Sequence, residues 1–203
     1  MRLCRDLGTF ATLGKFVREY IDGKFKGANR LLATLSKRYS DAAKELGLPH
    51  VPHVFDLKHG RLTGTHYRTM ARVIETIMCD YTEDCPDLIH LVHHTVTWYW
   101  AAHAPSFTNE SLVELRELGV TMCDAWIQMD TPEFRASLRK DHDMPKGPIV
   151  DIPKFHRALN HLPDYIRKFG PAADLTTETS EAAHKPLKQM FRTYVRLMFA
   201  AHA

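Results

Sequence analysis

Several features that would place this 203-residue chain in a familiar class are missing from its sequence. No apolar run reaches the roughly 18 to 20 residues that span a bilayer, because histidines interrupt even the most apolar stretch, 88–104. Charged residues follow Met1 at once, where a secretory signal peptide would carry an apolar segment. These absences predict an intracellular protein with no membrane partner.

Paired cysteines and common catalytic motifs are also missing. The chain has no CxxC pair, which argues against a zinc ribbon and against a disulfide scaffold, so reduced and mostly buried thiols are expected. No serine lies in a GxSxG turn and no glycine-rich loop of the phosphate-binding type is present, so ordinary hydrolase and nucleotide-binding signatures are absent. The four cysteines are Cys4, Cys79, Cys85 and Cys123.

Charge is unevenly distributed, although the net charge is only +3. Residues 1–38 contain nine Lys or Arg against three acids, and residues 185–203 contain four basic residues and no acid. Both ends of the chain are therefore basic. Clustered positive charge of this kind favours contact with phosphates.

Apolar residues recur at helical spacing along most of the chain, whereas alternating Val, Ile and Thr runs are scarce. We therefore expect an all-α protein of about seven helices, with a basic helical region over 1–60 and a second helical region over 61–203. Gly47 and Gly170 are expected to end helices, and Pro163 is expected to kink one. The expected helices cover 10–21, 24–46, 63–79, 87–103, 108–126 and 151–170, with another starting at 131 and a terminal helix; an edge strand is expected at 51–57.

Two of these helices carry patterns that bear on packing. In the helix over 108–126, Leu112, Leu115 and Val120 follow one another towards Trp126 as apolar positions. In the helix over 87–103, the aromatic run 98–100 offers rings that can stack on nucleic-acid bases, but such a run within a helix more often packs in a core or an interface. We expect packing.

Histidine is abundant, with 13 residues, and its densest group lies at 90–94. Asp87, His90 and His94 are spaced i, i+3 and i+7, which places three ligand-type side chains on the helix face opposite the apolar stripe. Three protein ligands and a water molecule are typical of a catalytic metal site. The alternative is a polar helix face that is rich in histidine.

The last third of the chain contains a second candidate site. Glu178, Glu181 and His184 share one side of a helix, where they can bind a divalent ion or exchange protons. The alternative is an acidic helix start, in which the carboxylates lie favourably at the positive end of the dipole. The terminal helix that follows has an apolar stripe and an opposite basic strip, which is either solvated or a phosphate contact. The basic strip consists of Lys185, Lys188, Arg192 and Arg196.

Several short landmarks occur between Gly60 and the end of the chain. These are Leu62-Thr63-Gly64 with Met70 and Val73; Pro105-Ser106 with Thr108 and Leu112; Ile152-Pro153-Lys154 with His156, His161, Ile166 and Gly170; and Thr177-Glu178 with Glu181 and His184. In the order and spacing of these landmarks, the chain resembles the C-terminal part of fungal transposases of the Plavaka type, cut-and-paste enzymes with an RNase H-like core.

This resemblance implies that Glu178 is the last acid of a three-carboxylate catalytic site, in which two Mg²⁺ or Mn²⁺ ions activate water or a DNA 3′ hydroxyl. The other two acids of such a site lie on upstream strands. The sequence pattern of residues 1–150 predicts helices, so we expect the site to be incomplete here. Pro186 departs from the pattern, because it interrupts the helix that should carry the glutamate.

The resemblance therefore predicts a truncated, transposase-derived fragment that is catalytically inactive alone and binds DNA or a partner through its basic ends, in the nucleus. Apolar surface left where the sheet would have packed predicts self-association. Two other functions remain open: a small helical metal-binding enzyme, and a plain helical interaction module.

Overall fold

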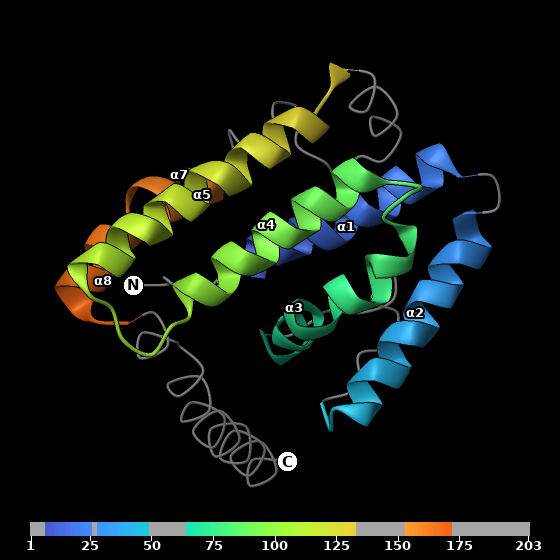
Figure 1. Cartoon of the computed structure of the whole chain (residues 1–203), viewed down its shortest axis with the longest axis horizontal. Helices are drawn as coiled ribbons and strands as arrows, with labels where there is room; N and C mark the ends of the chain where they lie inside the picture. Colours follow the sequence, from blue (N-terminus) through green and yellow to red (C-terminus); the bar gives the residue numbers. More distant parts are fainter. Residues whose placement is uncertain (1–6, 26–27, 49–63, 133–152, 172–203) are drawn as a thin grey trace, which may run out of the picture.

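The computed structural model describes residues 7–25, 28–48, 64–132 and 153–171 (Figure 1). Helices account for the regular structure of this part of the chain, which contains no strand, so the all-α prediction is confirmed there. The predicted edge strand at 51–57 lies outside the described residues. The helices are α1 (Leu7–Lys24), α2 (Ala28–Glu45), α3 (Gly64–Met78), the 3-10 turn η1 (Cys79–Tyr81), α4 (Pro86–Ala102), α5 (Asn109–Met129), α7 (Pro153–Asn160) and α8 (Leu162–Phe169).

Local chain chemistry sets several helix ends where the sequence predicts them. Gly47 follows α2 with a φ of 62°, which a residue with a Cβ adopts only with strain, and it lets the Leu48 N–H donate to the carbonyl of Ala43. The Thr108 side chain accepts from the Ser111 N–H while the Ser111 hydroxyl accepts from the Thr108 N–H, and this reciprocal pair begins α5.

The segment 151–170 differs from its prediction as one kinked helix. α7 ends at Asn160, and α8 begins at Leu162 with Pro163 in its first turn. Proline has no N–H to donate, but the N–H groups of a first turn have no helical partner in any case. Pro163 therefore costs α8 no backbone hydrogen bond. Gly170 ends α8 with a φ of 88°, as predicted.

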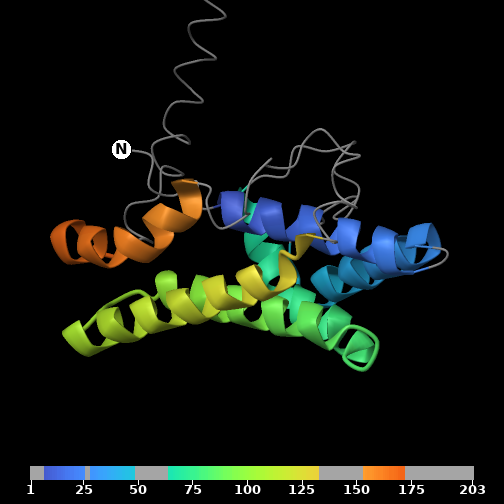
Figure 2. The same ribbon diagram turned by 90° about the horizontal axis from the view of Figure 1, so that it is seen from above.

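The helices form two layers, as the turned view in Figure 2 shows. α4 and α5 pack along each other as an antiparallel pair in one layer, and α1, α7 and α8 lie in the other. α2 packs on α1 and α3 at one side of this arrangement (Figure 1). One core cluster includes residues from both predicted regions of the chain.

Aromatic side chains join the two layers at Trp126 of α5, which is fully buried. The ring of Phe16 on α1 and the ring of Phe155 on α7 meet it edge-on, with centroids 5.0 and 5.5 Å away. Gly119, two turns earlier on α5, allows close approach: a Cβ there would lie 2.9 Å from Cδ2 of Leu159 and 3.3 Å from Nε1 of Trp98. α5 is thus the helix on which α1, α4 and α7 converge.

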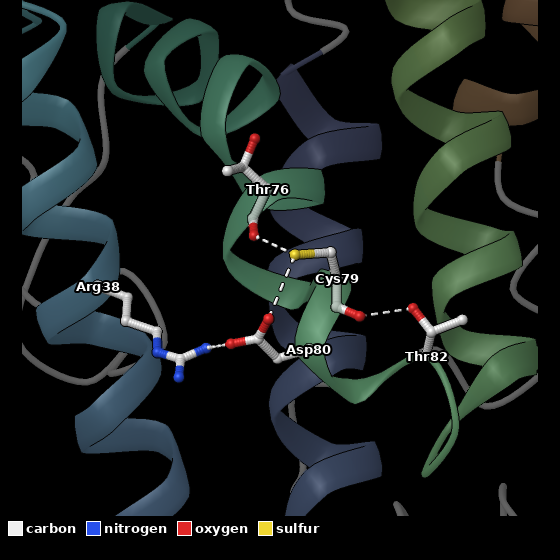
Figure 3. Close-up of polar contacts among 5 residues, drawn as sticks. All are labelled: Arg38, Thr76, Cys79, Asp80 and Thr82. Atoms are coloured by element: carbon white, nitrogen blue, oxygen red, sulfur yellow. Dashed lines mark hydrogen bonds and ion pairs between the residues drawn. The ribbon is translucent and has the colours of Figure 1, made fainter.

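A polar corner joins α2 to the end of α3 (Figure 3). Nη1 of Arg38 lies 2.6 Å from Oδ2 of Asp80 in η1. The Cys79 thiol donates to the carbonyl of Thr76 at 3.0 Å, and the Thr82 hydroxyl donates to the carbonyl of Cys79 at 2.7 Å. These local bonds end α3 and turn the chain towards α4.

The three cysteines in the described part of the chain are free thiols, as predicted. Cys85 and Cys123 are buried and Cys79 is exposed. Burial raises the pKa of Cys123 to about 11, so this thiol stays protonated at neutral pH. None of the helices described above combines the length and the hydropathy that a membrane-spanning segment requires.

Candidate functional site

Two groups of predicted site residues fall beyond the part of the chain that the structure describes, so they remain predictions. The first is the proposed carboxylate site, with its catalytic acid. The second is the basic strip of the predicted terminal helix. The residues concerned are Glu178, Glu181 and His184, and Lys185, Lys188, Arg192 and Arg196.

The third predicted group, Asp87, His90 and His94, lies on α4. The opposite side of this helix is buried against the core, so Asp87 and His90 are exposed and His94 is half-buried, as their spacing predicted. The buried side consists of Leu88, Leu91, Val92, Thr95, Val96, Trp98, Tyr99 and Ala102.

The structure brings two members of this group into contact. Nε2 of His90 lies 2.8 Å from Nε2 of His94, and the rings meet edge-on with centroids 4.2 Å apart. The neighbouring His93 turns towards α3, where its Nδ1 lies 2.8 Å from Oε1 of Glu75. Within the described residues, no three His, Cys, Asp or Glu side chains are grouped so that they could hold a metal ion, so Asp87 does not complete a triad.

The His90–His94 contact requires that at least one ring is neutral, because the nitrogen of one ring must accept what the other donates. The pKa of His94 is lowered, first by partial burial and then by the nearby His90 and His93. The lowered pKa favours His94 as the neutral ring of this pair.

The aromatic run on α4 is divided between core and surface. Trp98 and Tyr99 are buried, which confirms the expectation of packing. Trp100 is 38% exposed, and the guanidinium carbon of Arg72 on α3 lies 5.8 Å from the centre of its ring. A cation over an aromatic face in this way contributes modestly to holding α3 beside α4.

α5 carries an exposed apolar stripe, which the sequence pattern alone does not distinguish from the residues of the core. Val113, Val120 and Ile127 are 57%, 51% and 55% exposed, whereas the expected neighbours Leu112 and Leu115 are buried. Side chains spaced seven residues apart lie in line along one face of a helix. The heptad spacing of the three was the available signal, and we refer to them as the α5 stripe.

Acidic residues surround the α5 stripe. Glu117 and Asp124 each follow a stripe valine by four residues, so they lie on the same face, and both are exposed. Glu110 and Glu114 add further exposed negative charge, and Arg116 is the exposed basic residue of this helix. The surface therefore combines an apolar line with an excess of negative charge.

No protein-family model matches the chain, and neither curated proteins nor solved structures provide a significant match. The resemblance to Plavaka-type transposases accordingly remains an expectation from the landmarks in the sequence. Among those that the structure describes, Met70 and Val73 are buried in α3, Thr108 begins α5, and His161 separates α7 from α8.

Proposed function

We propose that this chain is a transposase-derived helical module that binds another helix and does not cut DNA alone. The ordered landmarks in the sequence support the transposase origin. Glu178 is the one acid of the implied three-carboxylate site that they identify, which supports the absence of cleavage by the isolated chain. The observation that carries the binding function is the α5 stripe with its acidic surroundings.

The stripe is large enough to contribute to binding but too small to act by itself. Fully burying a Val or Ile side chain is worth about 1.5 to 3 kcal/mol, so covering three that are half exposed contributes about 2 to 4 kcal/mol. That free energy alone corresponds to about millimolar affinity or weaker, before the entropy of association is counted. A useful partner must therefore also exploit the charges.

The charges favour a basic amphipathic helix as the partner. A partner with apolar residues every three to four positions can cover the stripe while its Lys or Arg side chains approach Glu117 and Asp124. A second copy of α5 would instead bring an acidic surface against an acidic surface, with Arg116 as its basic residue, and like charges disfavour such a pair.

Residues 185–203 of this chain provide a probe with the required chemistry, because they contain four basic residues, no acid and apolar residues at helical spacing. We would titrate a labelled peptide of this sequence with the full-length protein and follow fluorescence anisotropy. The test variant is Val113→Ser, Val120→Ser and Ile127→Ser combined, and the matched control is Leu46→Ser, since Leu46 is 61% exposed at the end of α2.

We expect the peptide to bind the wild-type protein and the Leu46→Ser control equally, and the triple variant at least about tenfold more weakly, which is a loss of about 1.4 kcal/mol. A peptide with glutamate in place of its four basic residues should not bind. Equal binding by wild type and triple variant, or no binding by wild type, would overturn the proposed function. A dimer in light scattering that the triple variant dissolves would identify a second copy as the partner instead.

DNA is the second candidate partner, and the sequence feature that favours it is the absence of acids among the four basic residues of 185–203. This segment lies outside the described residues, so its contact with phosphates is a proposal from the sequence. Binding of Mg²⁺ or Mn²⁺ at Glu178 is likewise a proposal from the sequence, and such a site needs further carboxylates beside this one.

A further inference from the structure

His90 and His94 lie one turn apart on α4, and their Nε2 atoms are 2.8 Å apart. We propose that these two side chains form a bidentate site for a divalent transition-metal ion of the Zn²⁺, Ni²⁺ and Cu²⁺ class. This site is independent of the α5 stripe and of the carboxylates that the transposase resemblance implies. It lies on the exposed face of α4, where an ion from solution can reach it.

The distance between the rings suits a shared ion after a small adjustment. A Zn–N bond is about 2.0 to 2.1 Å, so two imidazole nitrogens in a tetrahedral shell lie about 3.3 Å apart. The present Nε2–Nε2 distance is 2.8 Å, so the rings need to separate by about half an ångström. His90 is exposed and can make this movement by side-chain rotation, while the helix holds the two Cβ atoms at a fixed spacing.

Binding of the ion releases no proton when both rings are neutral. One ring then donates its Nε2 proton to Nε2 of the other, so a lone pair already points at the shared position. Coordination by both Nε2 atoms moves that proton to Nδ1 of the same ring through solvent, and nothing is released. Metal ions bind neutral imidazole, so the affinity for the ion falls as the pH falls.

The neighbouring side chains that the structure describes provide no further ligand for the ion. His93 contacts Glu75 across to α3, so it is already engaged. Asp87 lies one turn before His90 but forms no three-ligand group with the pair in the described structure. Water therefore fills the remaining positions on the ion, and affinity follows the general order for nitrogen ligands, in which Cu²⁺ exceeds Ni²⁺ and Zn²⁺.

Nickel chloride is the probe of choice, because the exposed thiol of Cys79 would complicate the use of copper. We would titrate the full-length protein with Ni²⁺ by calorimetry at neutral pH and record the shift in melting temperature. The test variants are His90→Ala and His94→Ala. The matched controls are His93→Ala on the same helix and His156→Ala, since His156 and His161 form another ring pair with centroids 5.1 Å apart.

We expect one site that stabilises the protein against heat and that is at least about tenfold weaker in either test variant, because each removes one arm of the chelate. Both controls should keep the wild-type affinity, and circular dichroism should show that all four variants are folded. Wild-type affinity in His90→Ala or His94→Ala, an equal loss in His93→Ala, or the absence of Ni²⁺ binding by the wild-type protein would each overturn the proposal.

Discussion

Replacing Phe155 with alanine tests whether α7 completes the core on α5. The Phe155 side chain is fully buried, and its ring meets that of Trp126, which in turn meets Phe16 of α1. Truncating such a side chain removes apolar atoms from the core and leaves a cavity. The free energy of unfolding typically falls by about 3 to 5 kcal/mol. In a protein of this size each kcal/mol lowers the melting temperature by about 2 to 4 °C, so we expect a decrease of about 6 to 20 °C.

The matched control is Phe169→Ala at the end of α8. This phenylalanine is 44% exposed, so the same truncation should cost about 1 kcal/mol or less. Urea unfolding followed by circular dichroism measures both variants against the wild type. If Phe155→Ala unfolds at the same urea concentration as Phe169→Ala, then α7 does not pack against Trp126 and the two-layer core described above is wrong.

Three further predictions concern charge. Arg38→Ala should lower stability by no more than about 1 kcal/mol, because the Arg38–Asp80 pair is exposed to solvent; a larger loss in urea unfolding would contradict this. The pKa of His94 is lower in the folded state than in the unfolded state, so its contribution to stability is present above a pH of about 6.5 and is lost as the pH falls further. His94→Asn should therefore lose less stability than wild type between about pH 7 and 5, and parallel pH profiles would refute the assignment. Binding to a labelled DNA duplex should weaken with added salt and fall in a combined alanine variant of the basic strip, whereas unchanged anisotropy would exclude that contact. The residues to change together are Lys188, Arg192 and Arg196.

The sequence predicted the elements whose signals are local. Gly47 and Gly170 end helices because their positive φ angles suit glycine, and Thr108 begins α5 because its hydroxyl satisfies a free backbone N–H. The exposed position of Asp87 and His90 also followed from spacing alone, since the opposite face of α4 is apolar. Each of these outcomes depends on a few neighbouring residues and on no distant partner.

Other outcomes depend on contacts that periodicity does not contain. Pro163 was expected to kink a continuous helix, but the chain interrupts the helix at His161 and uses the proline to begin α8. The sequence also grouped three possible metal ligands on α4, whereas the structure joins His90 to His94 and turns His93 to Glu75. The first contact lies within α4 and the second joins α4 to α3, and the spacing of the residues alone does not determine which partner each ring takes.

The strongest case is α5, where apolar residues occur on two faces. Leu115 and Val120 are equivalent in the sequence pattern, yet α4 and α7 approach along the face that contains Gly119 and leave Val120 outside. A single exposed apolar side chain such as Leu46 is ordinary on a protein surface and requires no explanation. Three in line on the helix that also organises the core, surrounded by acids, give α5 an apolar face that the described helices leave uncovered. That geometry is the reason for assigning the binding of a partner helix to α5, apart from the metal site proposed at the histidines of α4.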